Sequence, residues 1–323
     1  MASYNRKLLL ICVPLVLLLV VAIWAIRKSQ EPRADFDPNA SSPDIHEGTG
    51  TDTDLPNDQL RNSITDLFLK HPIEEADHPL DPALQVARKG LAHIRSEVQD
   101  YTATVVKQER IKGELLEEEF FECKIRHPSR EDEGADTPLS FYLKFINPKR
   151  VAGREVIWVE GQNDGKLIAH EGGGILGMVR ASLDPNDRIA MVGNLHPITE
   201  LGMETLIVRM IEKGQRAKKL GKDNCQVTVD RSIKIDGHRG TRITITHPKQ
   251  LEGYEFYQAV IFIDDELNLP VGYEGYLWPE SDSGQPVLLE RYFYSDIKTN
   301  LGLKDEDFDP DNPQYNFPRT KIF

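Results

Sequence analysis

Aromatic side chains that could bind an apolar ligand are concentrated in the last quarter of the chain. They lie in or beside segments of strand-like composition, and seven are candidate ligand-binding residues: Tyr254, Phe256, Tyr273, Tyr276, Trp278, Tyr292 and Tyr294. Because alternate residues of a strand face the same side of a sheet, subsets of these rings would share one surface. We expect that most of these rings form core and that some line a cavity for an acyl chain.

Glycine-rich segments give no support to a nucleotide site. Residues 172–177 read GGGILG, but Asp184 and Pro185 follow too soon for the long helix that a dinucleotide site requires. Residues 161–166 read GQNDGK, one residue short of a phosphate-binding loop, and Leu167 replaces the Ser or Thr that binds Mg²⁺. A G-x-S-x-G nucleophile motif is also absent from the sequence. We therefore predict no catalytic residue and no cofactor.

Acidic residues near the C-terminus alternate as at the start of a calcium-binding loop: Asp305, Asp307, Asp309 and Asp311. The sixth position is Pro310 rather than Gly and the twelfth is Asn316 rather than Glu, so the segment is not an EF-hand. An irregular calcium site is the one metal hypothesis that these acids leave open. The nine histidines contain no H-E-x-x-H pair, and we predict no metal-ligating residues.

Two of the three cysteines, Cys123 and Cys225, fall in segments expected to be strands. In an exported protein they could form a disulfide if their Cα atoms lay within about 7 Å. The interpretation that we prefer is that both are small buried apolar side chains. Three cysteines in 323 residues are too few for a disulfide scaffold.

The net charge is −13, from 39 basic and 52 acidic residues. An acidic protein lacks the basic surface that nucleic acid requires, so we expect no nucleic-acid partner. Much of the charge lies in residues 29–58, which carry eight acids and one base and are expected to be a disordered linker. Residues 59–323 then form the folded domain.

The N-terminal segment 1–28 has the pattern of a membrane anchor. Leu8–Ile26 carry no charge, and basic pairs precede and follow this run. At about 1.5 Å per residue, such a helix matches the roughly 30 Å hydrocarbon core. We expect a single-pass anchor in a bacterial inner membrane with the C-terminal domain in the periplasm, and the alternative is a cleaved signal peptide and secretion.

The pattern of apolar residues predicts an α+β domain. Helices are expected at Gln59–Lys70, from an N-cap at Asp81 to Asp100, and at Pro197–Leu220. About ten strands follow from period-two alternation, with hairpin turns at residues 163–165 and 236–237. We expect a large curved antiparallel sheet, an incomplete barrel, packed around helices, plus the N-terminal transmembrane helix.

The order of these elements resembles a known family. Four segments carry the resemblance: YTATVVKQERIKGEL from Tyr101, YLKFINPKRVAGREVIWVEGQNDGK from Tyr142, FIDDELNLPVGYEGYLWP from Phe262 and LERYFYSDIKTNLGLKDEDFDPDNPQYNF from Leu289. Over Leu84–Phe317 they look like the bacterial domain-of-unknown-function 1571 family. More distantly they resemble the periplasmic lipoprotein carriers of the LolA and LolB type. The resemblance implies an incomplete barrel with an apolar concave face, but no known activity.

Three functions are compatible with the sequence. The first is a non-enzymatic envelope protein that binds a lipid, an acylated lipoprotein segment or another apolar ligand. The second is a tethered structural or protein-interaction module. The third is a hydrolase that uses His170, Glu171 or scattered carboxylates. A continuous apolar cavity of roughly 300 Å³ or more would favour the first, and a packed interior would favour the second.

Overall fold

The computed structural model describes residues 44–47, 63–70, 73–129, 137–174, 176–281, 284–319 and 321–322. The expected anchor in residues 1–28 lies outside these ranges, as does nearly all of the expected linker. In the described ranges, no helix is both long enough and apolar enough to cross a membrane.

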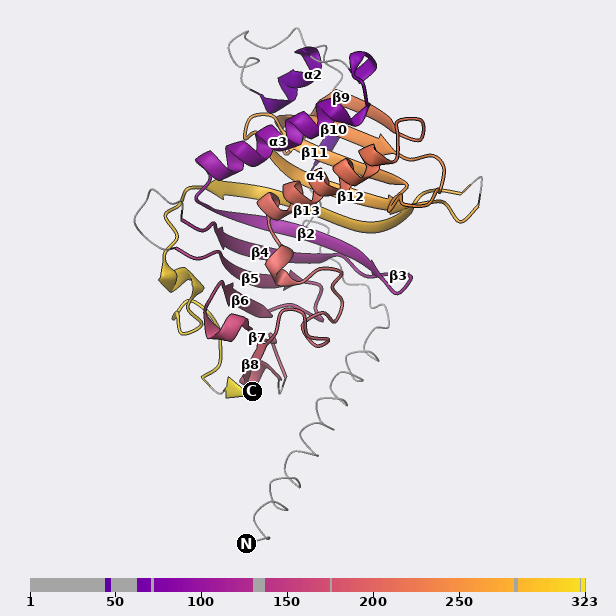
Figure 1. Cartoon of the computed structure of the whole chain (residues 1–323). Coiled ribbons are helices and arrows are strands. Elements are labelled where there is room, and N and C mark those ends of the chain that lie inside the picture. The colour runs from indigo at the N-terminus through magenta and orange to yellow at the C-terminus, as the bar shows by residue number, and fades with distance from the viewer. Residues whose placement is uncertain are drawn as a thin grey trace. The chain divides into compact units, whose positions relative to one another are not determined.

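The domain is built on one large, open, mostly antiparallel sheet (Figure 1). In chain order its described strands are β1 (Ile45–Glu47), β2 (Asp100–Ile111), β3 (Glu114–Leu115), β4 (Glu119–Arg126), β5 (Ser140–Asn147), β6 (Glu155–Val159), β7 (Leu167–His170), β8 (Arg180–Leu183), β9 (Gln226–Ile235), β10 (His238–Thr246), β11 (Gln258–Asp264), β12 (Leu269–Leu277), β13 (Val287–Thr299) and β14 (Lys321–Ile322).

The spatial order is β1-β9-β10-β11-β12-β13-β2-β4-β5-β6-β7-β8-β14, with β3 paired to β2 alone. Neighbours are antiparallel except β14, which runs parallel to β8. The expected large antiparallel sheet of an α+β domain is therefore confirmed, and it is not closed. The period-two pattern missed the short strands β1, β3, β8 and β14, because two to four residues are too few to show alternation.

Both predicted hairpin turns are present. Asp236 and Gly237 join β9 to β10 with φ angles of 50° and 85°, which a tight hairpin between twisted strands requires. Asn163, Asp164 and Gly165 join β6 to β7, and all three also have positive φ. The Asp-Gly and Asn-Asp-Gly sequences thus fix the register of these strand pairs.

The main helices α3 (Leu80–Glu97) and α4 (Met203–Lys219) pack against each other on one face of the sheet. Figure 1 shows both helices lying across the strands β9–β13. Apolar residues at three- and four-residue spacing give α3 its buried side, including Leu80, Leu84 and Ile94. The sheet also holds the first residue of α4. The main-chain amide of Met203 donates to the hydroxyl of the buried Tyr101 in β2 at 3.1 Å.

Helix boundaries differ from the sequence-based expectation. The N-cap of α3 is Pro79 rather than Asp81, which lies in the first turn, and the helix ends at Glu97. The expected helix Pro197–Leu220 begins only at Met203, because Gly202 has a φ of 104° and interrupts it after a 3-10 turn. Within 63–70, the expected helix Gln59–Lys70 is reduced to a 3-10 turn and the short helix α2 (Leu67–Lys70).

The C-terminal segment covers the sheet face opposite the helices beside β5 and β6. Phe308 and Tyr315 pack with Tyr142 and Ile157, and the rings of Tyr142 and Tyr315 stack at 4.0 Å. Nearby acids pair with bases: Asp305 with Arg126, Asp307 with Lys124, and Asp311 with Arg180. These carboxylates therefore fasten the tail to the sheet.

Candidate ligand-binding site

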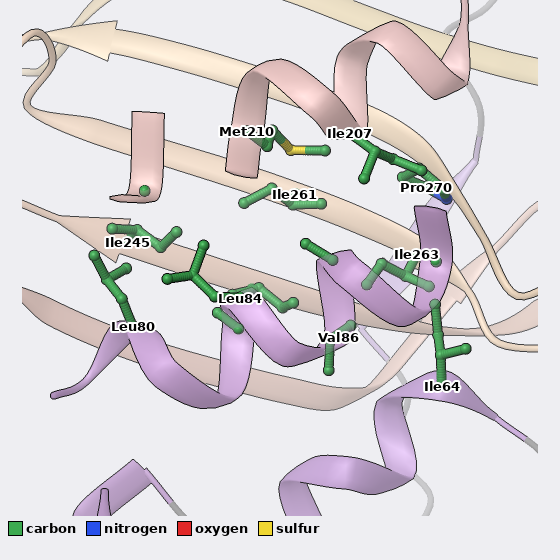
Figure 2. A pocket seen from close by; sticks show the side chains of 15 residues that line it. Ile64, Leu80, Leu84, Val86, Ile207, Met210, Ile245, Ile261, Ile263 and Pro270 are labelled. Atoms are coloured by element: carbon green, nitrogen blue, oxygen red, sulfur yellow. The ribbon is translucent and has the colours of Figure 1, made fainter. Parts of the chain in front are cut away.

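A small apolar cavity lies between the helix pair and the sheet. Its volume is about 60 Å³. Its lining is aliphatic apart from glycine: Ile64, Leu80, Ala83, Leu84, Val86, Ala87, Gly90, Ile207, Met210, Gly214, Ile243, Ile245, Ile261, Ile263 and Pro270. Figure 2 shows the side chains of α3, α4 and the strands converging on this space. Such a lining can bind hydrocarbon but offers no group for acid–base chemistry.

The sheet side of the cavity follows from strand alternation. Ile243 and Ile245 of β10 lie two residues apart and so face the same side. In β11, Ile261 pairs with Ile243 in the antiparallel register, and Ile263 continues the row. The result is a floor of β-branched side chains, which hold few rotamers and keep their shape.

The helix side of the cavity is hollow because small residues stand where large ones would fill it. Ala83, Ala87 and Gly90 recur along α3 at three- and four-residue spacing, so they lie on one face. On α4, a Cβ at Gly214 would lie 2.9 Å from Cδ2 of Leu84, so glycine permits the close approach of the two helices. The sequence signal for this cavity was thus a stripe of small residues.

None of the seven candidate aromatic residues lines this cavity. Tyr273 and Tyr292 belong to the adjoining core on the helix side, and Tyr294 is buried under Gly202. Tyr276 faces the opposite side of the sheet, where it lines a shallow polar concavity of about 410 Å³ with Glu274. The ligand-binding role of the seven residues stays a prediction.

The other three candidates gather around the buried His247 at the end of β10. The rings of Tyr254 and Phe256 lie 4.5 and 4.9 Å from its imidazole, and Nε1 of Trp278 donates to its carbonyl at 3.0 Å. Nε2 of His247 and Nε2 of the nearby His78 are buried and have no hydrogen-bond partner among the residues that the structure describes. Burial, reinforced by His78, lowers the pKa of His247, so this end of the sheet favours uncharged groups.

A cluster of charged groups adjoins the other end of the apolar core. Glu290 of β13 is buried, and its carboxylate lies 2.7 Å from Nε2 of His196 and 3.5 Å from Nζ of Lys213. Arg209 reaches the same imidazole at 3.0 Å. Burial alone would raise the pKa of Glu290, but the hydrogen bond from His196 and the charges of Lys213 and Arg209 hold that pKa at about 2.

Gly275 makes room for this carboxylate. It pairs with Glu290 across β12 and β13, and a Cβ there would lie 3.0 Å from the hydroxyl of Tyr273 and 3.3 Å from Cγ of Glu290. The hydroxyl of Tyr273 is within hydrogen-bond reach of Glu290. The charged cluster and the apolar core therefore meet at Tyr273 and at Tyr292, whose hydroxyl donates to Glu290 at 3.4 Å.

The cluster continues across β2 and β4 through further buried charges. Nζ of Lys107 lies 3.0 Å from Glu119 and 3.7 Å from Glu109, and Arg150 lies 2.9 Å from Glu119. Burial disfavours the charge on Glu119, but Lys107 and Arg150 outweigh it and lower its pKa. Glu109 also accepts from the hydroxyl of Tyr292. Sequence reasoning missed this network, because a charged residue in an alternating strand normally points to solvent.

Both cysteines in the described residues are free. Cys123 lies in β4, whereas Cys225 precedes β9 by one residue and packs near Leu80 and Leu84. The possible disulfide is therefore not formed, and the preferred interpretation as buried apolar side chains is confirmed. Burial raises the pKa of the Cys123 thiol to about 12 and that of Cys225 to about 11, which keeps both protonated at neutral pH.

His170 and Glu171, the residues named for a hydrolase, have structural contacts. Nε2 of His170 lies 3.3 Å from the buried Glu155, and Glu155 also accepts from the amide and side chain of Asn316 in the tail. Glu171 pairs with Arg154 at 3.0 Å. Neither residue lines the two described concavities. His170 and Glu155 hold the tail, since the ring of His170 also lies 4.8 Å from that of Phe317.

The glycine-rich residues 172–174 form a loop after β7. A Cβ at Gly172 would lie 2.0 Å from the carbonyl oxygen of Ala152, so glycine is required for this contact between backbones. A 3-10 turn at Leu176–Met178 and strand β8 follow. The prediction of a loop between two strands of the sheet is confirmed.

Fold and site together define an α+β domain with an open antiparallel sheet and an aliphatic cleft under two helices. The family model for DUF1571, a protein family of unknown function, matches residues 98–317, which is more than half of the chain. The chain belongs to this family, as the sequence resemblance implied. No curated protein gives a significant match.

Solved structures to which this chain is similar include a DUF1329 family protein from Desulfovibrio piger (13% identity, TM-score 0.35, 72% of this chain and 98% of that chain covered). A putative outer membrane lipoprotein-sorting protein domain from Vibrio parahaemolyticus is also similar (14% identity, TM-score 0.33, 70% of this chain and 95% of that chain covered). So is a LolA superfamily protein from Nitrosomonas europaea (10% identity, TM-score 0.26, 70% of this chain and 97% of that chain covered). At these identities and TM-scores the likeness transfers no function to this chain.

Proposed function

We propose that the domain binds an aliphatic chain, of a lipid or an acylated polypeptide, in the cleft between α3, α4 and the sheet. The observation that carries this proposal is the cavity whose walls are aliphatic on all sides. Each methylene group that leaves water for such a site contributes about 0.8 kcal/mol. The binding is non-enzymatic, since the cavity walls contain no titratable side chain.

Binding requires the helices to move away from the sheet. The cavity of about 60 Å³ is smaller than the roughly 300 Å³ expected of a ligand site. Small residues at Ala83, Ala87, Gly90 and Gly214 leave few side chains interlocked at the contact, which lowers the cost of separation.

In the proposed setting, residues 1–28 anchor the protein in the inner membrane and residues 29–58 tether the domain in the periplasm. Support comes from the uncharged run Leu8–Ile26 with its basic flanks and from the acidic composition of the linker. A tethered domain samples the lipid surface beside its own anchor, which suits the uptake of a membrane-derived chain.

The alternative is a tethered protein-interaction module. Its support is the largely filled interior, together with apolar side chains exposed on the segment between β7 and α4: Met178 (68% exposed), Ile189 (45%) and Val192 (59%). A protein partner that covers these residues would account for their exposure.

Extraction of lipids from the purified full chain, followed by mass spectrometry, tests the proposal. We expect a co-purifying acyl species that is lost in Ala87→Leu, which fills the cavity wall, and kept in Gln85→Leu, which adds the same side chain on the exposed side of α3. Folding of both variants is checked by thermal unfolding. Lipid-free wild-type protein that forms a stable cross-link to an envelope protein would instead support the interaction module.

A further inference from the structure

We propose that the ligand of this cleft is an amphiphile with an anionic head group, and that Lys213, Arg209 and His196 bind this head. The inference rests on the proposed function, because it assigns the polar end of the same site. It concerns a network that plays no part in binding the aliphatic chain itself.

The apolar cavity and the basic groups are served by neighbouring faces of α4. Ile207, Met210 and Gly214 line the cavity, and Arg209 and Lys213 are spaced between them on the same helix. Met210 also packs against the core cluster that contains Tyr273. Because residues three or four apart in a helix are neighbours, a chain beside Met210 ends within reach of Lys213.

Tyr273 lies between the apolar core and the basic groups. Its ring belongs to the core cluster with the cavity residues Ile243 and Ile261, and the ring centroid lies 6.0 Å from Nζ of Lys213. Its hydroxyl lies within hydrogen-bond reach of Glu290. Tyr273 therefore borders both the aliphatic core and the charged groups.

Basic groups converge here on one buried carboxylate. Lys213 approaches Glu290 only at 3.5 Å, a long contact for an ammonium group. Arg209 has Glu200 as its close acidic partner at 3.2 Å, and Nδ1 of His196 lies 3.6 Å from the same acid. The low pKa of Glu290, about 2, is consistent with a positive potential at this point.

The basic groups are reachable from solvent, whereas the carboxylate beneath them is not. The side chains of Lys213, Arg209 and His196 are 22%, 26% and 24% exposed, against 4% for Glu290. Glu200 is 42% exposed and sits in the 3-10 turn before α4, so a ligand anion can displace it. The remaining charges of the network, on Lys107, Glu109, Glu119 and Arg150, neutralise one another.

Photolabelling tests the proposal on the full chain in lipid nanodiscs. The probes are a long-chain alkyl sulfonate, which stays ionised, and the alcohol with the same chain and the same diazirine. We expect the sulfonate to label the peptides of α4 and β11 at about tenfold lower concentration than the alcohol, which corresponds to about 1.4 kcal/mol. Excess inorganic phosphate should leave this labelling unchanged.

Lys213→Met keeps the aliphatic stem and removes the charge. It should weaken sulfonate labelling about tenfold and leave alcohol labelling unchanged, and Arg209→Gln should act in the same direction. The matched control is Lys219→Met at the exposed end of the same helix. Thermal unfolding of each variant verifies that the domain is folded.

The labelling results distinguish the anionic head group from the aliphatic site itself. Equal labelling by both probes, unaffected by Lys213→Met, would overturn the anionic head and keep the aliphatic site. Displacement of the sulfonate by phosphate alone would assign the cluster to a free anion and overturn the amphiphile. Absence of labelling with either probe would overturn both the head-group inference and the proposed function.

Discussion

At the scale of single residues, Glu290 shows how burial and neighbouring charge compete. The carboxylate lies in a strand beneath α4, where desolvation disfavours its ionised form. His196 and Lys213 reverse this effect because they lie within 2.7 and 3.5 Å. Among the described residues, removal of the carboxylate would leave Lys213 without its acidic partner and His196 with Glu200 alone.

The pKa of Glu290 predicts a specific pH dependence. Its folded-state pKa, about 2, lies below the ordinary value of 4.5, so its contribution to stability is present above about pH 4.5 and is lost as the pH falls towards 2. A difference of this size corresponds to about 3 kcal/mol. Glu290→Gln should therefore lower the free energy of unfolding by about that amount at neutral pH.

Denaturant unfolding of wild type and Glu290→Gln at several pH values measures this effect. The difference between them should shrink as the pH falls below about 4.5. The same substitution at the exposed Glu252 serves as the control and should change little. A difference that stays constant with pH would show that the loss comes from packing and not from the charge.

At the scale of elements, glycine positions decide how closely strands and rings pack. Gly272 of β12 lies under Phe293 of β13 and Phe262 of β11, whose rings are 5.0 Å apart. Both phenylalanines are buried on the face opposite the helices. The absence of a side chain at Gly272 allows the two rings to meet across the middle strand.

Gly272→Ala should therefore destabilise the domain. The new Cβ would lie 2.3 Å from Cε1 of Phe293, so buried rings would have to move, at a cost of about 1–3 kcal/mol. Gly173→Ala is the matched control, because a Cβ there meets nothing within 4 Å and φ is not in the positive range. Chemical denaturation compares the two, and equal stabilities would contradict the packing argument.

At the scale of the domain, the C-terminal tail joins sheet strands that are distant in sequence. Phe308 is buried against the strands, and the guanidinium of Arg126 lies 4.9 Å from its ring. Asn316 donates to Glu155 further along the sheet. The tail covers apolar side chains of β5 and β6 that would otherwise face solvent on the side without helices.

Phe308→Ala should lower the free energy of unfolding by about 3 kcal/mol, as expected for a buried aromatic side chain. It should also speed hydrogen exchange in β5 and β6, which the tail covers. Leu301→Ala, at a half-exposed position of the same segment, should cost less than about 0.5 kcal/mol. Slow exchange in β5 and β6 of the Phe308 variant would show that the tail is dispensable for covering them.

The site was only partly predictable. The helix expected between Asp81 and Asp100 is present as α3, and its residues Leu84 and Ala87, three positions apart, both line the cavity. The predicted ligand-binding residues were large aromatic ones. The cavity arises instead where side chains are small, at Ala83, Gly90 and Gly214. Sequence patterns report which face is buried, whereas a cavity depends on the volumes that meet from three separate elements.

By itself, the sequence determined the long strands, their hairpin turns, the α+β class and the family, since these depend on local alternation, turn residues and the order of elements. Only the tertiary structure decided the charged network. Glu290, Lys107 and Glu119 each look like solvent-facing residues in their own strands, and strand register together with the position of α4 brings them into contact. Burial is a property of what covers a face, and no single strand carries that information.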